Sequence, residues 1–566
     1  MTTKEPPDQD GGRRLAPTPR RAAPRRDHLY PRSARFLDPT SALRFEGEQL
    51  SPTSYAGDQL LLRPGPDAAA VRALLVDAAG QEGYAAAFDE TDSALVALAE
   101  QAGVALDAAQ PLVVRVHLQR RHDGRPLPAP DAWPVLQRFR ALAGDHPERH
   151  AVQLEHLLTT AEGGLRPAPY VAHAAGLNPY VAHPYVASPY VAHPYVAHPY
   201  VAHGGDPYSQ PTPAATAEYA QPGWGGRMPV TWVGPRPTRR ADDELGGTRR
   251  PVVAVLDTGA GTHPWLPDSV VDREPRCADL RIGLTDPETD IERTGVVTGR
   301  LTGSLDIEAG HGTFIAGLVH QRCPDARILS VRVVQPDGVI NEYDVLQALN
   351  MLWLRQELAV RYRRPADLID VVSLSLGYYH EQPADALVDP LMLAPLRALA
   401  RLGVAVVVSA GNDATSRAMY PAAFAAYSGG VVGEVPDDEV PLVAVGATNP
   451  DGSIALFSND GPWVRAYRPG AGLISTVPTT FDAGQNASIQ VVEGGKVRAT
   501  IDPDNFRSGF ATWSGTSFSA PILAGDVAAC LNEAEVLRAD PDEPEDAVGA
   551  GRRAVRRAVP GLEEPH

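Results

Sequence analysis

Hydrophobic residues in the second half of the chain occur in short, nearly continuous runs separated by longer segments of helical period. PVVAVLD at 251–257, DVVSLSL at 370–376 and VAVVVSA at 404–410 are dominated by Val, Leu and Ala, which is typical of strands buried on both faces of a sheet. Between them, residues 342–364 and 391–403 repeat their apolar positions with the period of a helix. This alternation predicts an α/β fold with a mainly parallel sheet and helices on both of its faces.

A smaller α+β unit is predicted between residues 51 and 162. Strand patterns at 59–65 (QLLLRPG) and 111–118 (PLVVRVHL) alternate with helical patterns at 67–80 and 133–144. The unit lies well before the first buried strand of the α/β region, so we expect it to fold as a separate domain.

Composition sets the boundaries around these two units. The first residues are rich in Pro and Arg without apolar periodicity, and Asp, Glu and Pro accumulate after Arg538, so both ends are predicted to be disordered. The predicted organisation is a basic disordered tail at 1–50, a small α+β domain at 51–162, a repeat-containing, Pro-rich linker at 163–247, the α/β domain at 248–538 and an acidic disordered tail at 539–566.

The linker contains a repeat in which PYVA recurs six times between Pro169 and Gly205, five of the six units ending in histidine. Proline at a five-residue period forbids a continuous helix. In an extended chain, successive histidines such as His198 and His203 would lie about 15 Å apart, too far for one metal ion to bridge without turns. We therefore predict a semi-rigid spacer, with metal binding and a tyrosine-bearing partner site as the alternatives.

Three segments rich in small residues supply an acid, a base and a nucleophile. They are VVAVLDTGAG around Asp257, AGHGTFIAGLV around His311 and WSGTSFSAPILAG around Ser517. The order Asp, His, Ser is one of the known orders of a serine-hydrolase triad. Ser517 would be the nucleophile, His311 the general base and acid, and Asp257 the group that fixes the tautomer of His311 and stabilises its charged form.

A fourth segment, GVAVVVSAGNDA, offers the side-chain amide of Asn412 as a donor to the oxyanion of a tetrahedral intermediate. The backbone N–H of Ser517, at the predicted start of a helix, would be the second donor.

Each of these residues alone has an ordinary structural interpretation. DTG also occurs in aspartic proteases, but that mechanism needs two carboxylates and DTG occurs once here. Alone, His311 would more often be a structural histidine, Asn412 a turn residue and Ser517 a helix cap. Their joint occurrence in the right order and contexts favours the triad.

With these motifs, the region from about 248 to 532 resembles the catalytic domain of the subtilisin-like serine proteases. The related sedolisins replace the base by glutamate and the oxyanion donor by aspartate, so His311 and Asn412 argue against that family. The resemblance implies a serine endopeptidase that acts on polypeptides and requires no organic cofactor. Structural calcium is frequent in the family, but no carboxylate cluster is assigned to it here and no metal ligand is predicted.

The resemblance also implies a substrate-binding pocket for the residue before the scissile bond. VVSLSLG at 371–377 resembles the strand that pairs with an extended peptide. Ser375, Leu376 and Gly377 would form one wall of the pocket, and Ala410 and Gly411 the other.

Two alternatives stay open. The domain at 51–162 is either a prosegment, as many subtilisin-like enzymes carry, or an unrelated regulatory or recruitment domain. The alternative to an enzyme is a catalytically silent subtilisin-fold scaffold that recruits partners through the PYVAH array. The complete set of triad motifs disfavours the scaffold, because a fold without catalysis has no physical need for them.

Charge and composition exclude other classes. A net charge of −18 and a pI near 5.3 leave no basic stripe for a nucleic acid. The N-terminus lacks the apolar segment of a secretion signal, no run is long and apolar enough to span a membrane, and three cysteines imply no disulfide framework. We therefore expect a cytoplasmic protein whose partners are polypeptide substrates, with the small domain and the PYVAH repeat as candidate sites for a further partner.

Two insertions distinguish the α/β domain from a compact family member. One, at 272–295, lies between Asp257 and His311, and the other, at 486–510, precedes the nucleophile. Both are expected to lie at the edge of the substrate cleft.

Overall fold

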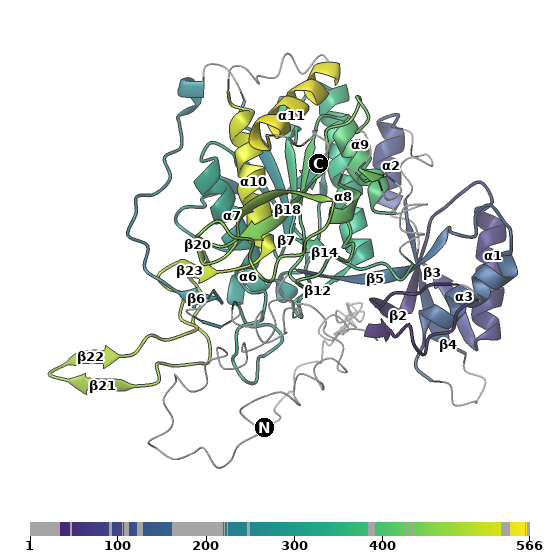
Figure 1. Ribbon diagram of the computed structural model, residues 1–566, viewed down its shortest axis with the longest axis horizontal. Coiled ribbons are helices and arrows are strands. Elements are labelled where there is room, and N and C mark those ends of the chain that lie inside the picture. Colours follow the sequence, from purple (N-terminus) through teal and green to yellow (C-terminus); the bar gives the residue numbers. More distant parts are fainter. Residues whose placement is uncertain are drawn as a thin grey trace, which may run out of the picture.

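The computed structural model describes residues 34–45, 48–89, 93–104, 106, 112–121, 128–160, 219, 221–222, 225–245, 249–382, 391–425, 427–428, 431–432, 435–533, 544–560 and 562. A large α/β domain lies beside a smaller N-terminal domain, drawn in purple and blue in Figure 1. Strand β5 (Val152–Thr160) runs from the small domain into the large one. The predicted basic tail up to residue 33 and the whole PYVAH repeat lie outside the described residues. The prediction of a disordered tail at 1–50 was wrong for residues 34–37, which form a strand that pairs with β2 (Thr53–Leu62) and buries Leu37.

The large domain is built on a parallel sheet with the strand order β19-β18-β15-β13-β7-β11-β8. Every residue of its three central strands is buried, as their continuous apolar sequences predict. The predicted α/β class is therefore confirmed. The strands are β7 (Val252–Asp257), β8 (Val271–Asp272), β11 (Arg327–Arg332), β13 (Val371–Leu374), β15 (Ala405–Ser409), β18 (Val443–Thr448) and β19 (Val464–Pro469).

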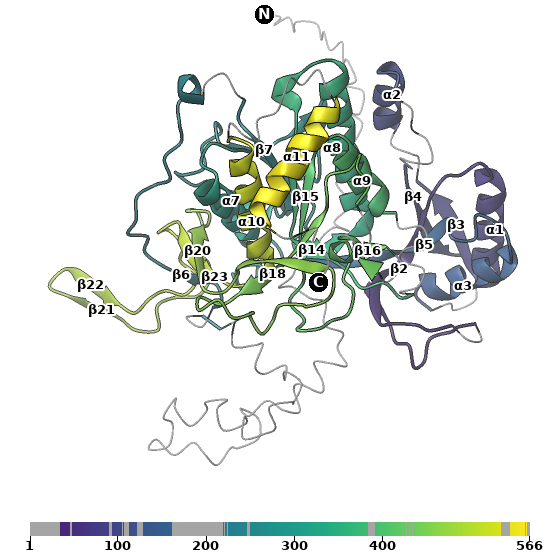
Figure 2. The ribbon, with the colours of Figure 1, turned by 45° about the horizontal axis from the view of Figure 1, so that its top comes forward.

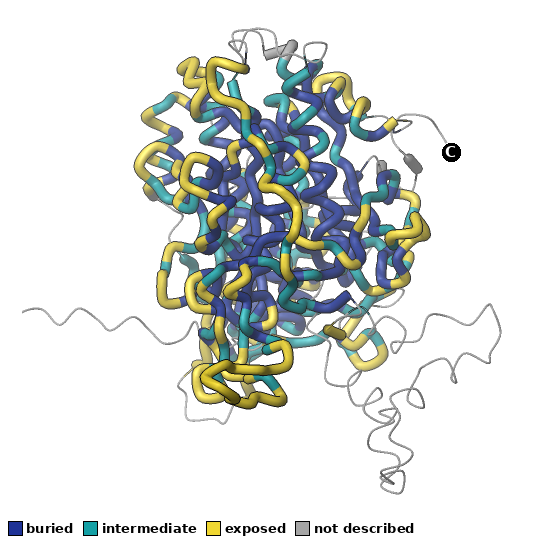
Figure 3. Tube along the Cα trace, turned by 90° about the vertical axis from the view of Figure 1, so that its left-hand side faces the viewer, coloured by how far each residue is buried: buried dark blue, intermediate teal, exposed yellow. Residues whose placement is uncertain are grey.

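Helices cover both faces of this sheet, and the side chains of each strand alternate between the two cores. Val253 and Val255 of β7 join the core formed with α7 (His311–Arg322) and α10 (Thr516–Cys530). Ala254 and Leu256 join the core formed with α8 (Glu342–Arg361) and α9 (Leu393–Arg401). Figure 3 shows the resulting buried interior in dark blue.

The N-terminal domain is an antiparallel sheet with the order β5-β2-β4-β3, in which β1 pairs with β2. Two helices, α1 and α3, pack on it and complete a separate hydrophobic core. Helix α2 instead packs on the large domain, because Leu95 and Ala99 belong to the core around α8. The elements are β1 (Ala34–Leu37), β2 (Thr53–Leu62), α1 (Ala68–Gln81), β3 (Tyr84–Phe88), α2 (Ser93–Gln101), β4 (Val114–Arg120) and α3 (Ala132–Ala143).

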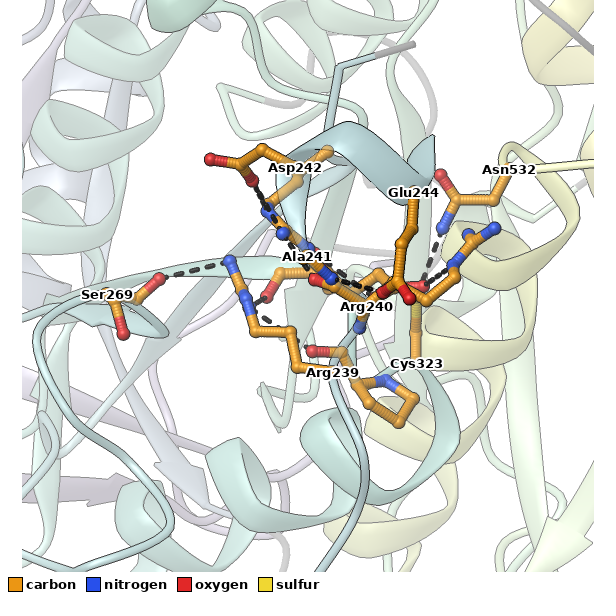
Figure 4. Close-up of polar contacts among 12 residues, drawn as sticks. Arg239, Arg240, Ala241, Asp242, Glu244, Ser269, Cys323 and Asn532 are labelled. Atoms are coloured by element: carbon orange, nitrogen blue, oxygen red, sulfur yellow. Dashed lines mark hydrogen bonds and ion pairs between the residues drawn. The ribbon is translucent and has the colours of Figure 1, made fainter. Parts of the chain in front are cut away.

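The segment at 225–245, which follows the repeat, is fastened to the outside of the large domain (Figure 4). The guanidinium of Arg239 donates to the backbone carbonyl of Ser269 at 3.1 Å. Arg240 donates from its backbone N–H and from Nε to the carboxylate of Asp325, at 2.8 and 2.7 Å. The predicted linker is thus bound to the domain surface just before its first central strand.

The C-terminal segment differs from the prediction of an acidic disordered tail at 539–566. Helix α11 (Pro544–Ala558) packs on α10, with Val548, Val555 and Val559 buried. These valines recur at helical spacing between arginines, an amphipathic pattern that the acidic, Pro-rich stretch before it obscures. The prediction was therefore wrong for this part of the tail.

The two insertions behave differently. The second forms a hairpin of β21 (Gln490–Glu493) and β22 (Lys496–Ala499), every residue of which is exposed. It projects away from the body of the domain and does not cover it (Figures 1 and 2). The first insertion packs against the sheet and carries the short helix α6 (Ile291–Thr294), whose role is described below.

Short elements complete the large domain. They are β6 (Met228–Pro229), β9 (Arg276–Cys277), β10 (Leu280–Arg281), β12 (Val339–Asn341), β14 (Leu376–Gly377), β16 (Tyr427–Ser428), β17 (Val431–Val432), β20 (Leu473–Thr476), β23 (Phe510–Trp513) and the 3-10 turns at Asp242–Leu245, Pro287–Thr289, Pro365–Asp367 and Ala422–Phe424. The three cysteines are buried, free thiols. Among the described residues, no helix combines the length and apolar character needed to cross a bilayer.

Candidate active site

Asp257 and His311 meet at the carboxyl end of the central sheet. Asp257 is the last residue of β7, and His311 is the first residue of α7. Nδ1 of His311 lies 2.8 Å from Oδ1 of Asp257, which also accepts the backbone N–H of Thr258 at 2.8 Å. Both side chains are buried, so the carboxylate is placed to fix the orientation and tautomer of the imidazole.

Ser517 lies in the first turn of α10. The ring of the next residue, Phe518, packs against the ring of His311 with 5.1 Å between the centroids. The backbone carbonyl of Ser517 accepts a hydrogen bond from Ser375 Oγ at 2.8 Å. Oγ of Ser517 is buried and makes no hydrogen bond to another described residue. The structure thus joins Asp257 to His311 by a hydrogen bond and brings the residue next to Ser517 against the ring of His311.

Asn412 is held by the start of the same helix. Its side-chain oxygen accepts two hydrogen bonds from Thr516, one from the backbone N–H at 2.9 Å and one from Oγ1 at 2.8 Å. Because the oxygen is engaged with Thr516, the amide N–H groups point away from it and stay available for another acceptor. This orientation suits a donor to an oxyanion near Ser517.

Gly411, beside Asn412, has a φ of +104°, which favours glycine. A Cβ at this position would lie 2.3 Å from Nδ2 of Asn459. Asn459 in turn donates to the carbonyl of Ala410 at 3.0 Å and accepts the backbone N–H of Asp413 at 2.9 Å. Asn459 thus fixes the loop that carries Asn412, a role for which its sequence context gives no signal.

The end of the predicted substrate-binding strand pairs with a strand of the N-terminal domain in this structure. β14, which contains Leu376 and Gly377, pairs with the end of β5, so that Leu376 faces Thr160. On the other side β12 pairs with β5, so that Val339 faces Thr159. Residues 157–160 of the N-terminal domain therefore form the middle strand of an antiparallel ladder between the two cleft strands.

Glu292, on α6, was missed by the sequence analysis. It accepts hydrogen bonds from the hydroxyls of Thr258 and Thr313, and from the backbone N–H of Gly310 at 3.0 Å. It therefore ties the loop after Asp257 to the start of α7. Burial raises the pKa of Glu292 to about 7, although the two threonine hydrogen bonds oppose this shift. Glu292 lies in the first insertion and belongs to no motif.

Two more groups that the motifs did not reveal lie at the loop before His311, one of them from the segment at 225–245. Arg227 donates to the carbonyl of Ile307 at 3.2 Å and to that of Ala309, and its guanidinium lies over the ring of Trp513. Glu308 is completely buried in the same loop. Burial raises the pKa of Glu308, against the attraction of His311.

One group of described side chains, His156, His380 and Glu381, has its metal-ligating atoms within 4.8 Å of one another. Here both ring nitrogens of His156 lie against carboxylates, and Nδ1 of His380 already accepts the backbone N–H of Gln382 at 3.0 Å. The arrangement is that of an ion pair between a histidine and carboxylates, and we assign no metal to it.

The chain is similar to several known proteases. Residues 248–546 match the subtilase family, Peptidase_S8. The serine protease AprX of Bacillus subtilis (strain 168) is 26% identical over 336 residues, which cover 55% of this chain and 66% of AprX. The intracellular serine protease of Paenibacillus polymyxa is 28% identical over 324 residues, which cover 54% of this chain and 74% of that protein.

Among solved structures, fervidolysin from Fervidobacterium pennivorans, a keratinolytic enzyme related to subtilisin, matches with 17% identity and a TM-score of 0.40 over 88% of this chain and 57% of its own. The chain spans slightly less than two thirds of AprX. The family match covers more than half of the chain and includes Asp257, His311 and Ser517. The chain therefore belongs to the subtilase family.

Proposed function

We propose that the protein is a serine endopeptidase that hydrolyses polypeptides and is made as a self-blocked precursor. The observation that carries this proposal is the strand at 157–160, which lies in an antiparallel ladder between β12 and β14. An extended polypeptide substrate would use the same main-chain hydrogen bonds, which accept any sequence.

In the proposed reaction, His311 removes the proton from Ser517 Oγ as it attacks the scissile carbonyl carbon, and the peptide C–N bond breaks as His311 returns the proton to the leaving amine. Asp257 holds Nδ1–H of His311 and stabilises the imidazolium that forms. Water then repeats the sequence on the acyl-enzyme, with His311 again as base, and releases Ser517.

The oxyanion formed in each half of the reaction would be held by the side-chain amide of Asn412 and the backbone N–H of Ser517. The position of Ser517 at the start of α10 adds the favourable end of the helix dipole. No step needs an organic cofactor or a metal, and calcium, where it binds, would be structural.

The N-terminal domain, in this proposal, is an inhibitory prosegment. Its last described strand fills the cleft, and Asp257, His311 and Ser517 are 1%, 0% and 0% exposed. Ser375, Leu376 and Gly377 form the wall that β5 covers, with Ala410 and Gly411 on the opposite side of the pocket. Because the ladder with β14 reaches Thr160, the last residue of β5, the first cut is expected within the few residues that follow it. This position favours a prosegment over an unrelated recruitment domain.

Labelling with a serine-directed fluorophosphonate tests the activity. The purified full chain should be labelled once it has cut itself, and a Ser517→Ala variant should be neither labelled nor cut. The new N-terminus should lie shortly after residue 160. An intact, unlabelled chain under all conditions would leave the scaffold that recruits partners through the PYVAH array as the better explanation.

The proposal also covers the cellular location of the protein and the role of the PYVAH repeat. One relative bears the name intracellular serine protease, which supports a cytoplasmic location for this chain. The PYVAH repeat would act as a semi-rigid spacer that joins the prosegment to the peptidase domain.

A further inference from the structure

The side chain of His156 fills a buried acidic pocket on the peptidase domain. His156 belongs to β5 and is 1% exposed. Its Nδ1 lies 2.7 Å from Oε2 of Glu342, and its Nε2 lies 2.8 Å from Oε2 of Glu381. Its ring also stacks on Tyr378, with 4.4 Å between the centroids and 26° between the planes.

The geometry requires a positive charge in this pocket. An ionised carboxylate only accepts hydrogen bonds, so both ring nitrogens of His156 must donate, which only the imidazolium can do. The other groups close to the pair are Arg140, 4.0 Å from Glu381, and His380, 3.5 Å from Glu381. Nδ1 of His380 accepts the backbone N–H of Gln382, so this nitrogen carries no proton, and burial lowers the pKa of the ring.

The pocket is a continuation of the substrate cleft. Glu342 follows directly after β12, and Tyr378 and Glu381 follow β14, so each wall strand leads into it. Both carboxylates are 1% exposed with the N-terminal domain in place. A chain seated in the same register without a cation would leave Glu342 and Glu381 without the partner that His156 gives them. The pocket should therefore discriminate strongly between side chains.

We infer that Glu342, Glu381 and Tyr378 form a cation-binding subsite for polypeptide substrates. The preferred substrates then carry Arg, Lys or protonated His four residues before the residue that takes the place of Thr160. All three pocket residues belong to the peptidase domain and stay with it after β5 leaves. This inference rests on the proposed endopeptidase function and adds to it a substrate class.

The test uses quenched-fluorescent peptides with the sequence of residues 152–164, in which the histidine at 156 is kept or replaced by Arg, Ala or Glu. The enzyme is the full chain after self-processing, with its active fraction counted by fluorophosphonate labelling. We expect kcat/KM for the Arg peptide to exceed that for the Ala peptide by about 10- to 100-fold, the range for charge-assisted hydrogen bonds, and the Glu peptide to be the poorest. Equal rates for Arg and Ala peptides at equal labelling would overturn the inference while leaving the endopeptidase intact.

Isosteric variants of the two glutamates test whether the preference for the Arg peptide arises in this pocket. In Glu342→Gln and Glu381→Gln the Arg-to-Ala ratio should fall several-fold, and in the double variant it should approach one. A ratio that stays at its original value in the double variant would overturn the assignment of the pocket, because the preference would then arise elsewhere. Absence of both labelling and cleavage overturns the proposed function and this subsite with it.

Discussion

Thr160, at the end of β5, pairs in antiparallel register with Leu376 of β14. The strand that ends the N-terminal domain is thus seated on the strand that the motif VVSLSLG predicts as the substrate-binding wall. In the proposed function, an extended substrate would occupy the position between β12 and β14 that β5 holds in this structure. A substrate could then bind between β12 and β14 only after β5 has left this position.

Replacing the proposed nucleophile should abolish both self-processing and proteolysis. In Ser517→Ala we expect kcat to fall by roughly four to six orders of magnitude, the scale found for loss of triad residues in subtilisin. Gel electrophoresis would show the chain uncut, and a peptide assay would give the rate. Circular dichroism serves as the control that folding is unchanged. Normal processing of this variant would contradict the assignment of Ser517.

The oxyanion donor can be separated from its structural contact with Thr516. Asn412→Asp keeps an oxygen that can accept the Thr516 N–H but lacks the amide donor, whereas Asn412→Ala loses both. Both variants should lose about 100- to 1,000-fold in kcat, the scale known for removal of such a donor in subtilisin, with a much smaller change in KM. Only the Ala variant should also lower Tm. Retention of kcat in the Asp variant would mean that the side-chain amide does not bind the oxyanion.

Glu292 should make the stability of the domain depend on pH. Burial raises its pKa to about 7, against the hydrogen bonds of Thr258 and Thr313, so the folded protein binds this proton more tightly than the unfolded chain does. The contribution of the protonated Glu292 to folding stability is fully present below the ordinary glutamate pKa, and it is lost as the pH rises through about 7. Glu292→Gln resembles the protonated form. As the pH rises from 5 to 8, its free energy of unfolding should increase relative to that of the wild type, by at most about 3 kcal/mol.

Thermal unfolding of the Ser517→Ala protein, with and without Glu292→Gln, measures this difference without self-cleavage. Two Tm curves that run parallel from pH 5 to pH 8 would show that Glu292 does not titrate in this range.

The attachment of the N-terminal domain should weaken in alkaline solution. Burial by itself lowers the pKa of His156, but Glu342 and Glu381 outweigh it and raise the pKa to about 10. The stabilisation of docking by the imidazolium is therefore fully present below the ordinary histidine pKa near 6.5, and it is lost as the pH rises through about 10. After self-cleavage, size-exclusion chromatography should find more separated domain at pH 10 than at pH 6.

His156→Gln is the matched control, because it keeps a polar side chain and cannot become charged. Its domain should separate at pH 6 as readily as the wild-type domain does at high pH. Tight association of this variant at every pH would mean that the ion pair contributes little to docking.

Helix α11 should be required for full stability. Val555 is completely buried against the core around α10, so Val555→Ala should cost about 1–3 kcal/mol in the free energy of unfolding, from lost burial and the cavity left behind. Arg556→Ala, at the exposed neighbouring position, should change it by about 0.5 kcal/mol or less. Urea unfolding of both variants in the Ser517→Ala background measures the difference. Equal stability of the two variants would place α11 outside the cooperative core.

The central fold could be predicted because its strands are buried on both faces. A parallel strand covered by helices on each side, such as β7 or β15, has no polar position, so its sequence alone identifies it. The motif around Asp257 was interpretable for a related reason. A carboxylate at the end of a buried strand, followed by Thr258 and Gly259, is rare enough to carry meaning.

Other features left no local signature. Glu292 is one carboxylate in an acidic insertion, and only its contacts with Thr258, Thr313 and Gly310 distinguish it. Helix α11 was hidden by acidic and proline residues before it, although Val548, Val555 and Val559 have helical spacing. The outward course of β21 and β22 also could not be predicted, since alternating strands fit a cleft cover as well as a free hairpin.

The sequence by itself determined the α/β sheet, the order Asp257, His311, Ser517 and the position of Asn412, because these depend on periodicity and on short motifs within one segment. Only the tertiary structure decided that β5 lies in the cleft and that His156 meets Glu342 and Glu381. Such contacts join residues far apart in the chain, and a main-chain ladder accepts almost any side chain. The sequence of one partner therefore does not identify the other.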